Sequence, residues 1–333
     1  MTFRRLILAA VILAYAVVVF GAFVRLSDAG LGCPDWPGCY GQAAVPQSGE
    51  ARGLARLKFP DKPLDETKAW IEMTHRYLAG TLGLLIFAIA VYALRKRAEF
   101  RQSTMLPLLL AGLVVLQALL GRWTVTLLLK PVVVSLHLLG GMATLALLCW
   151  FFLQQDAPRF ADTARISALR FWGWLGLLLL VMQIALGGWV SGNYAGLACG
   201  GFPLCDGSWV PGMDFASGFR FLGDQGTVAK GGPLSSAALT AIQWTHRLGA
   251  LIVLCYLASL AIVLVCVKRW QKYGVLLLVV LFLQIGLGIG NVLLSLPLPL
   301  AVAHNAVAAL LLVVMVMLNF KLTSFGSQRW HQA

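Results

Sequence analysis

Four histidines lie inside apolar segments of the chain, where few side chains other than an uncharged imidazole can bind a metal. They are His75, His137, His246 and His304. Each lies about five or six residues from the start of an apolar segment long enough to cross a bilayer. Two parallel helices that each present one histidine at the same depth can hold a haem iron between the two imidazoles. The spacing therefore predicts two haem sites with two axial histidines each.

Other roles for these histidines compete with haem ligation. A single histidine in a membrane segment is often a hydrogen-bonded packing residue, but polar side chains are costly in hydrocarbon, and four at matched depth favour function. Zinc or copper would need a third or fourth ligand, and no cysteine or carboxylate recurs beside both pairs. His331 lies in the polar C-terminal tail, where we expect it to be solvated.

Membrane helices must position these histidines, because 59% of the 333 residues are hydrophobic and only 12% are charged. Such a composition excludes a water-soluble fold and a disordered chain. We expect an all-α integral membrane protein with eight transmembrane helices. The predicted spans are 6–25, 71–94, 104–125, 131–153, 170–191, 241–267, 274–294 and 299–321.

The formal net charge of +13 follows from the expected topology. An even number of spans places both termini on one side, and the segments that share this side hold most of the basic residues, including Arg4, Arg5, Arg95, Lys96 and Arg97. Basic loops stay in the cytoplasm, so we expect cytoplasmic N- and C-termini in a multi-pass protein surrounded by lipid. The charge implies no nucleic-acid partner.

The chain contains an internal repeat, which an offset of about 170 residues makes visible. It aligns GAFVRLSDAGLGCPDWPGCYG from Gly21 with GGWVSGNYAGLACGGFPLCDG from Gly187, IEMTHRYLAG from Ile71 with IQWTHRLGAL from Ile242, LQALLG from Leu116 with LQIGLG from Leu283, and VSLHLLGG around His137 with AVAHNAVA around His304. We expect two pseudo-symmetric four-helix bundles of parallel topology, 1–160 and 161–333, related by duplication. Their outer loops would cover 26–70 and 192–240.

The two halves differ beside their first histidines. Glu72 precedes His75 by three residues and shares its helix face, whereas the aligned residue before His246 is Gln243. A desolvated carboxyl group suits a residue that exchanges protons, and a plain ion pair with Arg76 is the alternative.

An arginine follows the first histidine of each half, as Arg76 and Arg247. Both arginines can hold haem propionates in charge-assisted hydrogen bonds, or they can be ordinary arginines at the membrane interface.

Two cysteine pairs occupy aligned places in the outer loops. Cys33 and Cys39 lie in the first loop, and Cys199 and Cys205 in the second. The short spacing, rich in Gly and Pro, permits an intraloop disulfide in each loop, and the outer face is oxidising enough to keep it. We favour a structural role over a redox role for both pairs.

These motifs together resemble the haem A synthase family of bacteria and mitochondria. The segments Glu72-Met73-Thr74-His75-Arg76 and Trp244-Thr245-His246-Arg247 match its paired-histidine motifs, and RLSDAGLGCPDWPGCYG from Arg25 is similar to its outer-loop signature. The resemblance covers nearly the whole chain. It implies oxidation of the C8 methyl of haem O to the formyl group of haem A, for terminal oxidases, in the bacterial cytoplasmic (inner) membrane.

The resemblance also implies roles for individual residues. Glu72, His75 and His137 would serve the substrate haem O, and His246 and His304 would hold a permanent haem b. Candidate partners are haem O synthase and assembly factors of terminal oxidases. The loop cysteines occur in only part of the family, so the resemblance supports their role least.

Two other functions fit four histidines. A dihaem b-type cytochrome would pass electrons from quinol, and a haem or quinone transporter would carry out no redox chemistry. The carboxyl group beside one histidine pair favours an enzyme, because an electron conduit needs no acid there. The sequence leaves open the electron donor or acceptor, the oligomeric state (a homo-oligomer included), and whether an axial ligand leaves the substrate iron or oxidation proceeds at the macrocycle edge.

Overall fold

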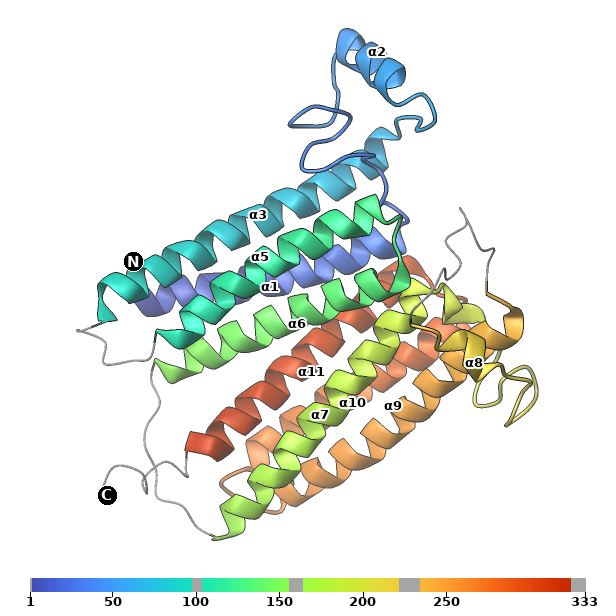
Figure 1. Ribbon diagram of the computed structural model, residues 1–333. Helices are drawn as coiled ribbons and strands as arrows, with labels where there is room; N and C mark the ends of the chain where they lie inside the picture. The colour runs from blue at the N-terminus through green and yellow to red at the C-terminus, as the bar shows by residue number, and fades with distance from the viewer. Residues whose placement is uncertain (1, 98–103, 156–163, 222–233, 325–333) are drawn as a thin grey trace.

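The computed structural model describes residues 2–97, 104–155, 164–221 and 234–324, and its regular structure within these ranges is helical (Figure 1). The helices are α1 (Phe3–Leu26), α2 (Gly49–Lys58), α3 (Glu66–Arg95), α5 (Met105–Thr126), α6 (Pro131–Gln154), α7 (Ala164–Gly192), the 3₁₀ helix η1 (Ala195–Leu197), α8 (Phe215–Gly218), α9 (Ser236–Val265), α10 (Gln271–Leu293) and α11 (Leu298–Ser324).

Within the described ranges, eight helices are long and apolar enough to cross a membrane: α1, α3, α5, α6, α7, α9, α10 and α11. The predicted all-α membrane fold with eight spans is therefore confirmed. Helix α1 begins and α11 ends at the end of the bundle that lies away from α2 and α8 (Figure 1). The even number of spans accounts for this arrangement.

The eight long helices pack in two groups of four. In the first group α1 packs on α3, α3 on α5, α5 on α6 and α6 on α1, and in the second α7 packs on α9, α9 on α10, α10 on α11 and α11 on α7. Each group is thus a closed ring, with α3 opposite α6 in the first and α9 opposite α11 in the second. Figure 1 shows the two groups side by side.

The two rings share one hydrophobic core. Helices α1 and α6 pack on α11, and α6 also packs on α7. Fully buried side chains such as Ile7, Leu145 and Leu277 belong to one continuous apolar cluster. The phenol of Tyr15 donates a hydrogen bond across the boundary to the carbonyl of Ala306 (3.1 Å). Because lipid tails are as apolar as these side chains, close van der Waals packing and this hydrogen bond hold the rings together.

Among the predicted spans that begin later than their helices, 71–94 and 241–267 lie on helices with a capping side chain. The apolar segments start at 71 and 241, but α3 and α9 begin at Glu66 and Ser236, because the side chains of Asp65 and Ser235 cap the helices one turn or more earlier. Each cap accepts a backbone N–H of the first turn, from Lys68 (3.1 Å) and Ala238 (3.2 Å). Hydropathy locates the apolar part of a helix and misses its polar first turns.

Two short helices form in the outer segments where the sequence predicts loops. Helix α2 forms within 26–70 where Ser48 caps it by accepting the N–H of Ala51 (3.1 Å). Helix α8 forms within 192–240, where the carboxylate of Asp214 accepts the N–H of Ser217 (3.0 Å). Hydrogen bonds from the hydroxyl and then the backbone N–H of Ser217 lower the pKa of Asp214. Both caps are local signals that compositional averaging over a long loop conceals.

The aligned outer segments follow the same backbone path. Positive φ angles at Asp28, Tyr40, Gly41, Leu128 and Leu129 recur at the aligned residues Tyr194, Asp206, Gly207, Ser295 and Leu296. Non-glycine residues rarely adopt such angles, so their recurrence at matched positions is specific. It supports a common origin of the two halves, which stays a prediction.

Candidate functional site

The four intramembrane histidines lie on helices at opposite corners of the two rings. His75 is on α3 and His137 on α6, and His246 is on α9 and His304 on α11. Within each ring the two histidine-bearing helices face each other across the centre. His137 and His304 occupy the same place counted from the start of their helices, and the places of His75 and His246 differ by one residue. The structure therefore places each predicted pair on opposite helices of one ring at matching heights, and ligation of haem by these pairs stays a prediction.

The imidazole nitrogens are in different surroundings in the two halves. Nδ1 of His75, of His137 and of His304 is buried and has no hydrogen-bond partner among the described residues. In the second half, the side-chain amide of Gln183 contacts Nδ1 of His246 (3.1 Å), and that of Gln284 contacts Nε2 of His304 (3.2 Å). Buried polar atoms without a partner are rare, and they mark places where a ligand completes the bonding.

Glu72 is held in a fixed place at the outer end of α3. Its side chain is 4% exposed. One carboxylate oxygen accepts the backbone N–H of Cys33 (2.9 Å), and the other pairs with the guanidinium of Arg76 one turn further along the helix. Because His75 is three residues from Glu72, the carboxylate and the imidazole share one helix face. The predicted pairing of Glu72 with Arg76 is present, and the bond to the loop adds a second anchor.

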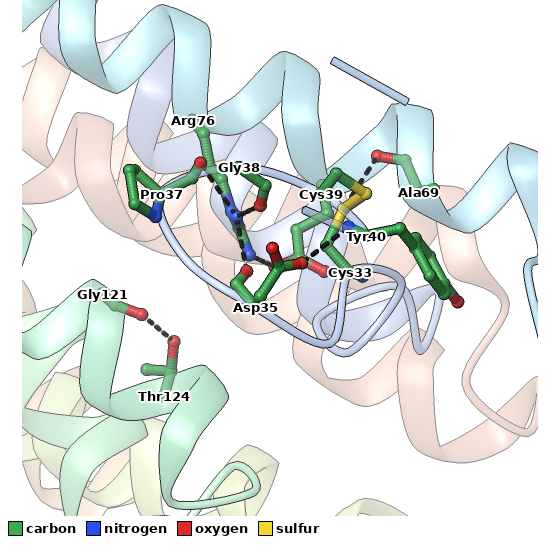
Figure 2. Close-up of polar contacts among 11 residues, drawn as sticks. Cys33, Asp35, Pro37, Gly38, Cys39, Tyr40, Ala69, Arg76, Gly121 and Thr124 are labelled. Carbon is green, nitrogen blue, oxygen red and sulfur yellow. Dashed lines mark hydrogen bonds and ion pairs between the residues drawn. A yellow bond between two sulfur atoms is a disulfide. The ribbon is translucent and has the colours of Figure 1, made fainter. Parts of the chain in front are cut away.

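Arg76 joins α3 to the first cysteine loop, as Figure 2 shows. Its Nη1 donates to the carbonyl oxygens of Asp35 (3.0 Å), Pro37 (3.2 Å) and Gly38 (2.6 Å). The carboxylate of Asp35 in turn accepts the N–H groups of Tyr40 (2.6 Å) and Gly41 (2.8 Å), which closes the loop on itself. These bonds use the guanidinium to fix the loop against the helix. A propionate contact of Arg76 stays a prediction.

The matched loop of the second half is held by Arg247 in the same way, although an amide stands at the place of Glu72. Arg247 donates to the carbonyl oxygens of Cys199, Gly201 (2.9 Å) and Leu204 (3.3 Å). Gln243, at the place of Glu72, donates through its amide to the carbonyl of Gly196 (3.2 Å). The second half therefore keeps the hydrogen bonds from the arginine to the loop carbonyls, and it has an amide in place of the carboxylate of Glu72. A propionate contact of Arg247 likewise stays a prediction.

Each outer loop contains one disulfide, Cys33–Cys39 in the first and Cys199–Cys205 in the second. In the first loop the bridge is buried with Tyr40 and Met73. Burial, together with the nearby carboxylates of Asp35, Asp65 and Glu72, raises the pKa of Tyr40. Its phenol stays protonated and donates to the carbonyl of Pro63 (3.1 Å). The bridge and this hydrogen bond stiffen the segment that supplies the N–H to Glu72.

Comparison with known proteins decides the family. The family model of the cytochrome oxidase assembly proteins, COX15–CtaA, matches residues 4–316. A protein of Shewanella oneidensis named heme A synthase is 40% identical over 270 residues, which are 81% of this chain and 81% of the relative. The chain belongs to this family.

Two more distant members carry the same name. The heme A synthase of Caulobacter vibrioides is 30% identical over 78% of this chain and 76% of its own length. That of Halalkalibacterium halodurans is 29% identical over 62% of this chain and 64% of its own length. The COX15–CtaA match therefore covers all eight long helices, and the predicted family resemblance is confirmed.

Some residues at this COX15–CtaA site escaped the sequence prediction. Gln183 and Gln284 touch the second pair of histidines, and a polar amide inside an apolar span is the signal that could have identified them. No three His, Cys, Asp or Glu side chains gather as a metal site in the part of the chain that the structure describes. His331 lies outside the described residues.

Proposed function

We propose that this protein is a haem A synthase, a membrane oxidoreductase that converts the C8 methyl of haem O into the formyl group of haem A. Relatives with this name match most of the chain. The observation that carries the proposal is the carboxylate of Glu72, which is buried on the helix face of His75 and replaced by Gln243 in the second half. One acid in two similar rings marks one ring as the catalytic half.

The first ring, within residues 1–160, is the substrate half. His75 and His137 bind the iron of haem O, because their helices lie opposite each other in the ring and the buried carboxylate of Glu72 shares the helix face of His75. The second ring, within 161–333, holds haem b on His246 and His304, where the same arrangement recurs. Haem b supplies one-electron transfer when it is bound.

Glu72 moves protons in this account. Conversion of a methyl group and water into a formyl group releases protons, while the electrons pass to an external electron acceptor. A buried carboxylate near the membrane surface can accept these protons and pass them outward. The N–H of Cys33 and the guanidinium of Arg76 orient the carboxylate. Arg76 also keeps the cysteine loop closed over this end of the ring, which excludes water from the site.

The orientation in the membrane follows from charge. Helix α1 begins and helix α11 ends at the same face of the bundle (Figure 1). The basic inner segments place that face in the cytoplasm. The disulfide loops then lie on the oxidising side, in keeping with their bridges.

Extraction of the haems from purified protein, followed by mass analysis, tests the proposal. The protein is produced with and without haem O synthase in the same cells. We expect haem B in both preparations and haem O or haem A only in the first. Haem B alone in both would contradict the synthase and would favour an electron-transfer cytochrome.

A further inference from the structure

Each of the four histidines packs against a glycine of the preceding long helix. A Cβ atom placed on Gly21 would lie 2.9 Å from Cε1 of His75, and one on Gly121 would lie 3.4 Å from Cε1 of His137. In the second half, a Cβ on Gly187 would lie 3.3 Å from Cε1 of His246, and one on Gly288 would lie 3.1 Å from Cε1 of His304. The contacts at Gly21, Gly187 and Gly288 are shorter than ordinary Cβ contacts, so a side chain there would push on the imidazole, and the contact at Gly121 is at the short end of the ordinary range.

The glycines occupy the two corners of each ring that hold no histidine. Gly21 is on α1 and Gly121 on α5, and Gly187 is on α7 and Gly288 on α10. Each imidazole therefore has bare backbone beside it, on the neighbouring helix. Gly21 and Gly187 are the first residues of the repeated outer-loop segments. Gly121 and Gly288 are the last residues of LQALLG and LQIGLG. The repeat thus preserves four contacts as well as four histidines.

Close contact with histidine is not a general property of glycines in these helices. A Cβ on Gly112 of α5 or on Gly286 of α10 would meet nothing within 4 Å. Gly140 and Gly249 lie against the amides of Gln117 and Gln183. The four glycines are thus distinguished by the imidazole that each one touches.

We propose that Gly21, Gly121, Gly187 and Gly288 are positioning residues that set the place and plane of the four imidazoles. The proposal rests on the proposed haem ligation. An axial imidazole must lie within a narrow range of distance and direction from the iron, and supporting contacts of this kind hold it there. A methyl group at the glycine would move the ring by a few tenths of an ångström, because the helix backbone behind it cannot give way.

Paired substitutions on one helix test the proposal in the second half. Gly288→Ala adds a methyl group against His304, and Gly286→Ala adds the same group two residues away in open space. Both changes raise helix propensity, so a loss in the first alone reports the contact. The full-length protein is made without haem O. The measurements are haem B per protein after detergent washing and the EPR spectrum of the low-spin ferric haem, which responds to the planes of its two imidazoles.

We expect about tenfold weaker haem retention and a shifted EPR signal in Gly288→Ala, and no change in Gly286→Ala. Gly187→Ala, where the clash is milder, should show a smaller shift in the same direction. It carries the test if Gly288→Ala fails to fold. Wild-type retention with an unshifted EPR signal in the folded Gly288→Ala and Gly187→Ala variants would overturn the proposal.

The first half gives the corresponding test with substrate. Gly21→Ala should lower the content of haem O and haem A more than Gly121→Ala, and Gly112→Ala should leave it unchanged. An equal loss in all three variants would overturn the role of these glycines. The haem B measurement of the second half stands even if the wild-type protein contains no haem O or haem A, so failure of the proposed function is distinguishable from failure of this inference.

Discussion

The two disulfide loops differ in what they hold. Both loops wrap their backbone carbonyls around an arginine, Arg76 in the first and Arg247 in the second. In the first loop the backbone N–H of Cys33 also faces a carboxylate, that of Glu72, whereas in the second an amide, Gln243, donates to a loop carbonyl. The same scaffold therefore supports a carboxylic acid in one half and a neutral amide in the other.

The histidines show the opposite difference. Both histidines of the second pair touch a glutamine amide. In the first half, Gln117 is aligned with Gln284, but its amide nitrogen is buried against Gly140 without a hydrogen-bond partner among the described residues. A restrained pair suits a group that stays bound, and a less restrained pair suits a haem that must enter and leave. The first half thus contains the carboxylate beside its histidine, and the second half contains the glutamine amides that contact its histidines.

Loss of an axial ligand in the second half should have the largest effect. His246→Met or His304→Met should abolish the low-spin b-type spectrum of protein made without haem O, because the iron would lose one of its two imidazoles. His75→Met, the matched change in the first half, should leave that spectrum intact. Absorption and EPR spectra of the three purified variants decide the matter. An unchanged spectrum in both second-half variants would refute the assignment of the halves.

Removal of the glutamine contacts should have an intermediate effect. Gln183→Leu and Gln284→Leu should each weaken haem B retention by about tenfold, since groups that orient a metal ligand carry effects of this size. Gln117→Leu is the matched control and should leave haem B unchanged. Equal haem B retention in all three variants would show that the amides do not restrain the imidazoles.

Removal of the disulfides should have the smallest effect. It should lower haem A formation only when the bridge of the first loop is removed. Each bridge closes a short loop and stabilises the protein by about 2 kcal/mol. The double change Cys33→Ser with Cys39→Ser should lower thermal stability and haem A formation together, because the bridge holds in place the backbone N–H of Cys33 that Glu72 accepts. Cys199→Ser with Cys205→Ser should lower stability alone. Thermal unfolding and haem A yield are measured on both double variants. An equal loss of haem A yield in the two variants would contradict the difference between the loops.

Much of the fold could be predicted from the sequence, because long apolar runs indicate membrane-spanning helices. The eight spans and the pairing of histidines across each ring needed only residue type and spacing. The true starts of α3 and α9 depended on the caps Asp65 and Ser235, which hydropathy does not register. Helix α2, within the first outer loop, was missed for the same reason.

The details of the site were harder to predict, because they depend on neighbours distant in the chain. The contact of Gln183 with His246 joins α7 to α9, and that of Gly21 with His75 joins α1 to α3. A single sequence shows an isolated glutamine and one glycine among 34, and nothing in it says which helix face meets which. Similarly, the bond from Cys33 to Glu72 follows from loop closure and not from spacing.

The haem composition and haem A yield of Glu72→Gln test the central claim most directly. The change places in the first half the residue type that the second half already carries, so the scaffold should accept it. The amide oxygen can still accept the N–H of Cys33, but glutamine cannot take up a proton. We predict normal haem content, no haem A, and accumulation of haem O or a hydroxylated intermediate. Near-normal haem A production by Glu72→Gln would contradict the account and would leave Glu72 as a structural partner of Arg76.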